Sequence, residues 1–356
     1  MNKKLILILS LVCFCLGGFV FAEFSADKTR QGIIKFMNAN GMGDKLDEPV
    51  SVTQDASGIF RIKDNGSYLV QYVILTPENK SVISPAVSTN LGLKTKRSCD
   101  KAVIVTHGWI DKAAGDWPAD LAGALAAKVD PNEWMVAYYD WQGGAAVASP
   151  IDAAKYSRDI AGPRLAKTFV TLLERGQRLS HVHLIGHSAG AWAVSTAAEI
   201  IAKQTGAQIH ITLLDAYVPP NWDEKEIAYV PSAKKVYAEH YYTKDITFDV
   251  THTDFTHAHN VDLTDVDMAI KAHEFPYKWY YSTVAGKYRK KDGIYAKQTG
   301  DTADGVKYGF ERGLEVSAEN FQESLSLKKA NEAVKIPRKK AKNIFDISSW
   351  FKKKKQ

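Results

Sequence analysis

The residues best suited to chemistry lie around Ser188, in the segment Gly186-His187-Ser188-Ala189-Gly190. An apolar run at 182–185 precedes this segment and an Ala-rich run with helical spacing follows it, so the pattern predicts a strand, a sharp turn and a helix. Such a turn strains the central residue and lifts its side chain off the backbone, while the glycines avoid Cβ clashes. An isolated Gly-x-Ser-x-Gly pattern is equally typical of an ordinary glycine-rich turn. Because strand and helix are both present, we expect Ser188 to be a nucleophile.

A serine nucleophile needs a base and an acid that orients the base. Asp215 follows a run at 208–214 that alternates β-branched and apolar residues, so we expect it at the C-terminal end of a strand. Five downstream histidines are candidates for the base: His240, His252, His257, His259 and His273. Each can equally be a solvated or hydrogen-bonded loop residue. The residue pattern alone therefore leaves the choice open.

A short His/Asp cluster lies within the same stretch and raises the question of a metal site. It consists of His252, Asp254, His257 and His259. No further ligands stand at a spacing typical of a tetrahedral site. We interpret this cluster as a polar loop.

Two backbone N–H groups are candidates for stabilising an oxyanion. Ala189 follows the nucleophile at the start of the predicted helix, where the helix dipole favours negative charge. A short apolar strand at 102–106 runs into His107-Gly108-Trp109-Ile110, and the loop after such a strand carries the second donor in folds with this turn. Trp109 is our candidate for that donor.

The elements around these residues alternate between strand and helix. We expect strands at 67–76, 102–106, 134–139, 182–185 and 208–214, and helices at 117–128 and 153–175, the latter containing Pro163. Gly206 should end the helix after Ser188, and residues 23–60 are expected to be irregular with one helix near 31–37. This order predicts an α/β fold with a mainly parallel sheet and helices on both faces. Trp109, Ser188 and Asp215 then all fall at carboxyl ends of strands, where such sheets place their active sites.

Composition sets the broad class of protein. The 356 residues are 45% hydrophobic and 24% charged, as in ordinary soluble globular proteins. The whole sequence has 46 basic and 40 acidic residues. Residues 328–356 contain 11 of the basic and 2 of the acidic residues, and residues 1–22 contain two lysines. Residues 23–327 therefore contain 33 basic and 38 acidic residues. The net basic charge therefore belongs to the tail. A nucleic-acid-binding face on one globular domain at 23–327 is not expected.

The first 22 residues have the features of a secretory signal peptide. Lys3 and Lys4 precede an apolar run at 5–21, and Ala22 ends an acceptable cleavage site. The alternative is an uncleaved membrane anchor, for which the run is short. Removal of residues 1–22 would leave Cys99 as the single cysteine, which fits a bacterial envelope or secreted product better than a disulfide-rich one.

Five separated motifs make the sequence resemble the pancreatic lipase family of α/β hydrolases, over residues 67–285. These are Val105-Thr106-His107-Gly108-Trp109-Ile110-Asp111-Lys112, Asp140-Trp141-Gln142-Gly143-Gly144, the turn at 182–191, Leu214-Asp215-Ala216, and His273 ahead of an aromatic helix. The resemblance implies an α/β-hydrolase fold and a triad of Ser188, Asp215 and His273. It also implies oxyanion donors at Trp109 and Ala189, hydrolysis of lipid acyl esters through an acyl-enzyme, and no metal or organic cofactor.

Several departures from the family bear on the substrate. The family's cysteines are missing, Ala216 replaces a proline, and only 83 residues follow His273, too few for the family's C-terminal β-sandwich. A short lid equivalent near 247–264 favours a phospholipase A1-like or broad esterase activity over strict triacylglycerol lipolysis. Two alternatives remain: a catalytically silent lipid- or partner-binding protein, and a serine hydrolase acting on amides.

The basic tail at 328–356 has two interpretations. A set of apolar residues lies on one helical face ahead of four lysines: Ile344, Phe345, Ile347, Trp350 and Phe351. This arrangement is typical of peripheral insertion at an anionic membrane surface. A solvated, disordered tail is the alternative.

Overall fold

The computed structural model describes only part of the chain. The described residues are 35, 39, 50–66, 99–111, 116–173, 178–244, 251, 253–264, 272–285, 295–296, 308–310, 324–326 and 334–335. Contacts divide the chain into Met1–Leu46 and Asp47–Gln356, and in the first unit only Lys35 and Ala39 are described. The expected signal peptide at 1–22, most of the helix at 31–37 and the strand at 67–76 lie outside the described residues. No helix among the described residues has the length and apolar character needed to cross a bilayer.

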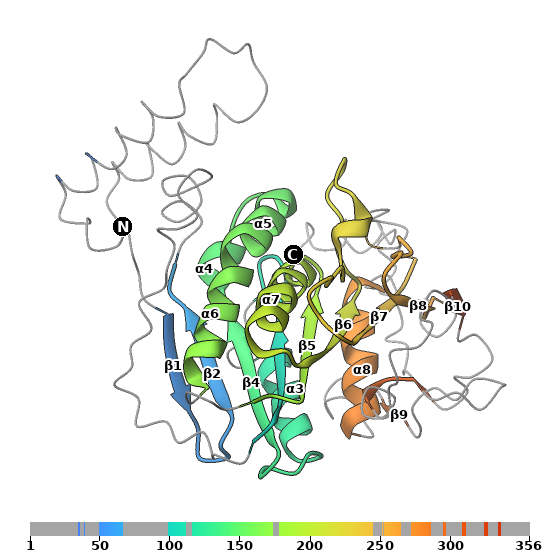
Figure 1. Ribbon diagram of the computed structural model, residues 1–356. Helices are drawn as coiled ribbons and strands as arrows, with labels where there is room; N and C mark the ends of the chain where they lie inside the picture. Colours follow the sequence, from blue (N-terminus) through green and yellow to red (C-terminus); the bar gives the residue numbers. More distant parts are fainter. Residues whose placement is uncertain are drawn as a thin grey trace, which may run out of the picture. The chain divides into compact units, whose positions relative to one another are not determined.

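The second unit is built on a nine-stranded sheet in the order β1-β2-β4-β3-β5-β6-β7-β8-β10 (Figure 1). Its strands are β1 (Val50–Gln54), β2 (Phe60–Asp64), β3 (Lys101–Thr106), β4 (Trp134–Asp140), β5 (His181–His187), β6 (Gln208–Leu214), β7 (Val236–Tyr242), β8 (His259–Asp262) and β10 (Ser324–Ser326). Only β1 and β2 pair antiparallel, whereas every other pair in this sheet is parallel. A separate antiparallel pair joins β9 (Tyr295–Ala296) to β11 (Val334–Lys335). The prediction of a mainly parallel sheet is confirmed.

Helices cover both faces of the sheet because its central strands are apolar on both sides. The helices are α3 (Trp117–Ala126), α4 (Gln142–Ala145), α5 (Pro150–Tyr156), α6 (Gly162–Leu172), α7 (Gly190–Thr205) and α8 (Phe275–Ala285). One core contains Leu184 of β5 with residues of α5, α6 and α7, and Figure 1 shows these helices over the central strands. The other core contains Ile185 of β5 with residues of α3 and α8. The α/β prediction with helices on both faces is therefore confirmed.

The helix ends follow from local sequence. Asp116 caps α3 by accepting a hydrogen bond from the Trp117 N–H at 2.7 Å, and α7 ends at Gly206 with φ 68°, as expected. The single helix expected over 153–175 is instead α5, a π-helical turn at Ser157–Ala161, and α6. Pro163 lies in the first turn of α6, directly after the π-helical turn, and has no N–H to donate to that preceding turn.

The expectation of irregular structure over 23–60 is wrong for its described end at 50–60. Val50–Gln54 forms β1, and β2 begins at Phe60 after a turn in which Gly58 has φ 84°. These strands are five residues long and include exposed polar positions, so their pattern is weak in sequence. The prediction of a lid near 247–264 is also partly wrong, because residues 259–262 form the strand β8 within the sheet.

Candidate active site

Ser188 lies in a strained turn between β5 and α7, as the sequence predicts. Its φ is 53°, a left-handed conformation that few residues other than glycine adopt. The Ser188 N–H donates to the Leu214 carbonyl at 3.0 Å, which ties the turn to the end of β6. A Cβ on Gly190 would lie 2.2 Å from the His107 carbonyl oxygen, and one on Gly186 would lie 2.8 Å from the Gly190 carbonyl oxygen. Both glycines are therefore required by close backbone approach.

Asp215 and His273 are joined by a hydrogen bond between His273 Nδ1 and Asp215 Oδ2 at 2.5 Å. Asp215 follows β6, and its Oδ1 accepts from the Thr243 N–H at 2.9 Å. Because an ionised carboxylate only accepts, the shared proton resides on Nδ1, and Nε2 is the nitrogen that can take a proton from a nucleophile. Burial raises the pKa of the Asp215 carboxyl above its ordinary value, and the contact with His273 opposes that rise.

The structure thus brings one of the five candidate histidines to Asp215. The others that are described have different partners: His240 Nε2 accepts from the Ala216 N–H at 3.2 Å, the His257 ring packs against Tyr229 in a tilted arrangement, and His259 Nε2 contacts the Tyr308 hydroxyl at 3.0 Å. Asp254 accepts a hydrogen bond from the Tyr242 hydroxyl at 2.9 Å. His252 lies outside the described residues.

His187 ties His273 to the turn that carries Ser188. The His187 Nε2–H donates to the His273 carbonyl at 3.0 Å, and the two ring centroids are 4.6 Å apart. The His187 ring also contacts Trp117 of α3 and Tyr277 of α8. Burial, together with the neighbouring His273, lowers the pKa of His187 well below its ordinary value, so this ring is neutral. The sequence pattern assigns His187 no role, because its partner is 86 positions away.

The loop after β3 passes directly beside Ser188. A Cβ on Gly108 would lie 2.7 Å from Ser188 Cβ, so the backbone of the next residue, Trp109, is held close to the turn. The Trp109 indole N–H donates to the Val147 carbonyl at 2.7 Å, and the Ile110 N–H donates to the Ala145 carbonyl at 3.1 Å. These contacts fix the loop that carries the candidate donor Trp109. The other candidate, Ala189, immediately precedes α7.

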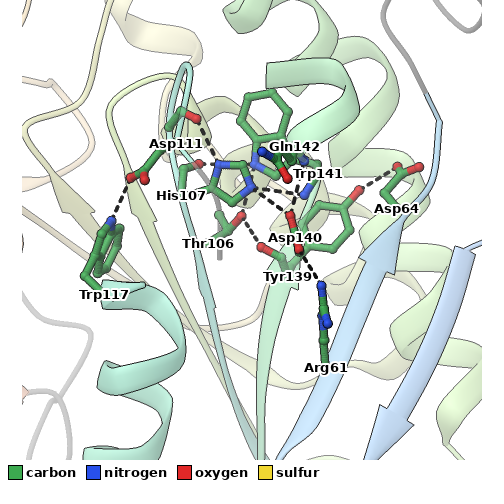
Figure 2. A network of polar contacts seen from close by, with 11 residues as sticks. Arg61, Asp64, Thr106, His107, Asp111, Trp117, Tyr139, Asp140, Trp141 and Gln142 are labelled. Atoms are coloured by element: carbon green, nitrogen blue, oxygen red, sulfur yellow. Dashed lines mark hydrogen bonds and ion pairs between the residues drawn. The ribbon is translucent and has the colours of Figure 1, made fainter. Parts of the chain in front are cut away.

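A buried polar network supports that loop from the side of β4 (Figure 2). His107 Nε2 accepts from the Trp141 N–H at 3.1 Å, so its Nδ1–H donates to the Gly108 carbonyl at 2.9 Å, and its ring stacks on Trp141. Asp140 Oδ1 lies 3.6 Å from His107 Nε2, and Oδ2 pairs with Arg61 at 3.0 Å. Burial disfavours the charge on Asp140, whereas the Arg61 guanidinium and the Gln142 N–H favour it and lower the pKa of Asp140 below its ordinary value.

The sheet order and the strand-turn-helix around Ser188 define an α/β-hydrolase fold. A family model described as Lipase matches residues 38–256, more than half of the chain. The chain therefore belongs to the lipase family.

Curated relatives support the same placement. Human pancreatic lipase-related protein 2 is 26% identical over 198 residues, covering 54% of this chain and 37% of the relative. Rabbit pancreatic triacylglycerol lipase is 31% identical over 178 residues, which cover 50% of this chain and 35% of the relative. Mouse pancreatic triacylglycerol lipase is 30% identical over 156 residues, which cover 42% of this chain and 30% of the relative. The chain thus spans about a third of the length of these relatives.

Proposed function

We propose that this protein hydrolyses carboxylic acyl esters of lipids through a triad of Ser188, Asp215 and His273. The observation that carries the proposal is the His273–Asp215 hydrogen bond, held by His187 against the turn that bears Ser188. A buried acid, a histidine that the acid holds through Nδ1, and a strained serine are the three parts that acyl transfer needs.

The proposed reaction proceeds in two steps. Ser188 Oγ attacks the acyl carbon while its proton passes to His273 Nε2, and the same proton then goes to the departing alcohol, leaving an acyl-serine. Water adds to the acyl-serine, gives a proton to His273, and releases the fatty acid as the proton returns to Ser188. Asp215 accepts the Nδ1–H bond throughout and stabilises the imidazolium.

The negative charge that develops on the carbonyl oxygen is assigned to the N–H groups of Trp109 and Ala189. Each such donor contributes on the order of 3 kcal/mol of transition-state stabilisation. Support for this assignment comes from the close approach of Gly108 to Ser188 and from the position of Ala189 ahead of α7. The residues in this reaction require no metal or organic cofactor.

Lipid esters are the proposed substrate class because the chain belongs to the lipase family. Phospholipid or a broad range of esters is preferred over triacylglycerol alone, since the sequence leaves little room for a long lid between Asp215 and His273. Export through the signal peptide at 1–22 would place the enzyme in the cell envelope or outside the cell, where membrane lipid is available.

The test is hydrolysis of p-nitrophenyl esters of two to sixteen carbons, and of phosphatidylcholine vesicles, by residues 23–356. Ser188→Ala should abolish hydrolysis, whereas Ser195→Ala should retain it, because Ser195 is a buried serine of α7 bonded to the Ala191 carbonyl. A folded wild type inactive on every ester would favour the silent binding protein. Activity on acyl amides alone would favour the amidase.

Peripheral membrane contact through the tail at 328–356 is a separate proposal. Because Val334 and Lys335 pair with β9, a deletion that leaves the fold intact should begin after them. Removal of 340–356 should keep hydrolysis of a soluble ester and lower binding to phosphatidylglycerol vesicles. Replacement of Phe345, Trp350 and Phe351 by serine, which keeps every lysine, should also lower binding if the apolar face inserts. Unchanged vesicle binding in both variants would contradict the proposal.

A further inference from the structure

The main chain at Asp215 is strained. Its φ is 49°, a left-handed conformation that costs free energy for a residue other than glycine. Such a conformation persists only where surrounding contacts hold it. The direction of the Asp215 carboxylate, and with it the hydrogen bond to His273 Nδ1, depends on this backbone conformation. The contacts that hold residues 215–217 therefore bear directly on the proposed triad.

Neighbouring elements hold this segment at both of its ends. The Asp215 N–H donates to the Tyr241 carbonyl of β7 at 2.8 Å. Two residues further on, the Tyr217 carbonyl accepts from the indole N–H of Trp192 in α7, also at 2.8 Å. The residue between these two anchors carries one more main-chain donor, and its partner is a side chain.

That donor is the Ala216 N–H, which donates to His240 Nε2 at 3.2 Å, and both residues are fully buried. A main-chain N–H can only donate, so Nε2 is the unprotonated nitrogen of a neutral ring that carries its proton on Nδ1. Two aromatic side chains fix the plane of the ring. Tyr242 stacks on it with centroids 5.0 Å apart, and Phe255 packs against it at 4.4 Å. The acceptor is therefore held in place beneath residue 216.

This hydrogen bond exists because residue 216 is not proline. Ala216 replaces the proline that the pancreatic lipase family has after its catalytic acid. A proline has no N–H and a φ fixed near about −65°, so the main chain after the acid would need no acceptor. Alanine restores an N–H that must be paired when it is buried, and it leaves the backbone freer to move. His240 supplies the partner that this departure requires.

We propose that His240 is a positioning residue for Asp215, and that its neutral ring acts by accepting the Ala216 N–H next to the acid. This inference rests on the proposed triad, and it gives a role to a histidine that the sequence offers only as a candidate base. The competing interpretation is a packing residue whose ring fills the core between Tyr242 and Phe255. A packing role depends on the shape of the ring, whereas a positioning role depends on the acceptor at Nε2.

Two substitutions separate the acceptor from the ring. His240→Phe keeps a ring and leaves the Ala216 N–H without an acceptor, so kcat for a p-nitrophenyl ester should fall roughly tenfold with KM nearly unchanged. His240→Gln places a carbonyl acceptor near the position of Nε2 but loses the ring contacts. It should melt at a lower temperature than wild type and still keep kcat within roughly twofold.

A second background tests the hydrogen bond itself. Ala216→Pro removes the N–H, so with this substitution in place the further change His240→Phe should alter kcat by less than roughly twofold. The matched control is His259→Phe, which replaces a buried histidine on the neighbouring strand β8 that contacts Tyr308. This control should keep kcat in both backgrounds. Circular dichroism establishes that each protein is folded before its kinetics are compared.

The outcomes distinguish the role of His240 from the triad. A folded His240→Phe protein as active as wild type would overturn the proposal, as would an equal loss of kcat with alanine and with proline at position 216. If His240→Phe does not fold, His240→Gln decides, because a tenfold loss of kcat in that folded protein would overturn the proposal and a retained kcat would support it. A wild type inactive on every ester would contradict the triad itself and the proposal with it.

Discussion

The proposed role of Asp215 depends on one hydrogen bond. Its carboxylate holds the proton of His273 on Nδ1, which leaves Nε2 to act as the proposed base. In Asp215→Asn the amide can donate to Nδ1, which favours the wrong tautomer. We predict that kcat for a p-nitrophenyl ester falls by about 10³- to 10⁴-fold while the folded structure is kept. Asp262→Asn, which alters a partly exposed aspartate of β8, serves as the control and should keep nearly full activity.

His187 is a positioning residue for the same ring. His187→Phe would keep an aromatic side chain beside Trp117 and Tyr277 but remove the donor to the His273 carbonyl. Loss of one hydrogen bond worth about 1 kcal/mol should lower kcat by roughly five- to tenfold and leave KM nearly unchanged. Steady-state kinetics on a soluble ester measure the split between kcat and KM. An unaltered kcat would show that this contact does not hold His273 in place.

At the scale of elements, the loop after β3 and the turn after β5 must pass each other closely. In Gly108→Ala the new methyl group would lie 2.7 Å from Ser188 Cβ and 3.0 Å from the His187 carbonyl oxygen, so the loop that carries Trp109 must shift. We predict at least a roughly hundredfold loss of kcat, the scale on which one oxyanion donor acts.

A second glycine provides the control for this prediction. Gly123 lies in α3, and a Cβ at this position would have no other atom within 4 Å. Gly123→Ala should therefore keep activity and raise the free energy of unfolding by up to about 1 kcal/mol. Equal kinetic effects of the two substitutions would contradict the close approach as the cause.

The sequence predicts this site as far as local pattern reaches. Glycine spacing around Ser188 and the apolar runs of β5 and β6 indicate where Ser188 and Asp215 lie, because both features are local. The contacts of His187 with His273, and of His107 with Trp141, join residues far apart in the chain and appear only when the sheet order is known. The strand β7 has no clear sequence signal, because it contains polar residues that are nevertheless buried. Glu239, for example, is buried and accepts a hydrogen bond from Thr212 on the neighbouring strand β6.

At the scale of the whole molecule, buried charge links stability to pH. The folded-state pKa of Asp140 lies below its ordinary value of 3.8, so its ionisation stabilises the fold above pH 3.8 and this contribution is lost as pH falls through the folded-state value.

Asp140→Asn lacks this contribution at every pH. Urea unfolding should therefore show the variant less stable than wild type at pH 7, with the difference in the free energy of unfolding narrowing as the pH falls from 5 to 3. The other carboxylates are common to both proteins and cancel in the comparison. A difference that stays constant from pH 7 to pH 3 would mean that the charge of Asp140 does not contribute in this way.

The central claim is that Ser188 is the nucleophile and that His273 and Asp215 activate it. The most direct measurement is covalent labelling by an alkyl phosphonate p-nitrophenyl ester, in which Ser188 Oγ attacks phosphorus and p-nitrophenolate leaves. We predict one phosphonyl group per chain, located by peptide mass spectrometry on Ser188, with p-nitrophenolate released in equal amount and labelling strongly slowed in Asp215→Asn. Labelling of another residue, or none in a folded protein that hydrolyses esters, would contradict the account.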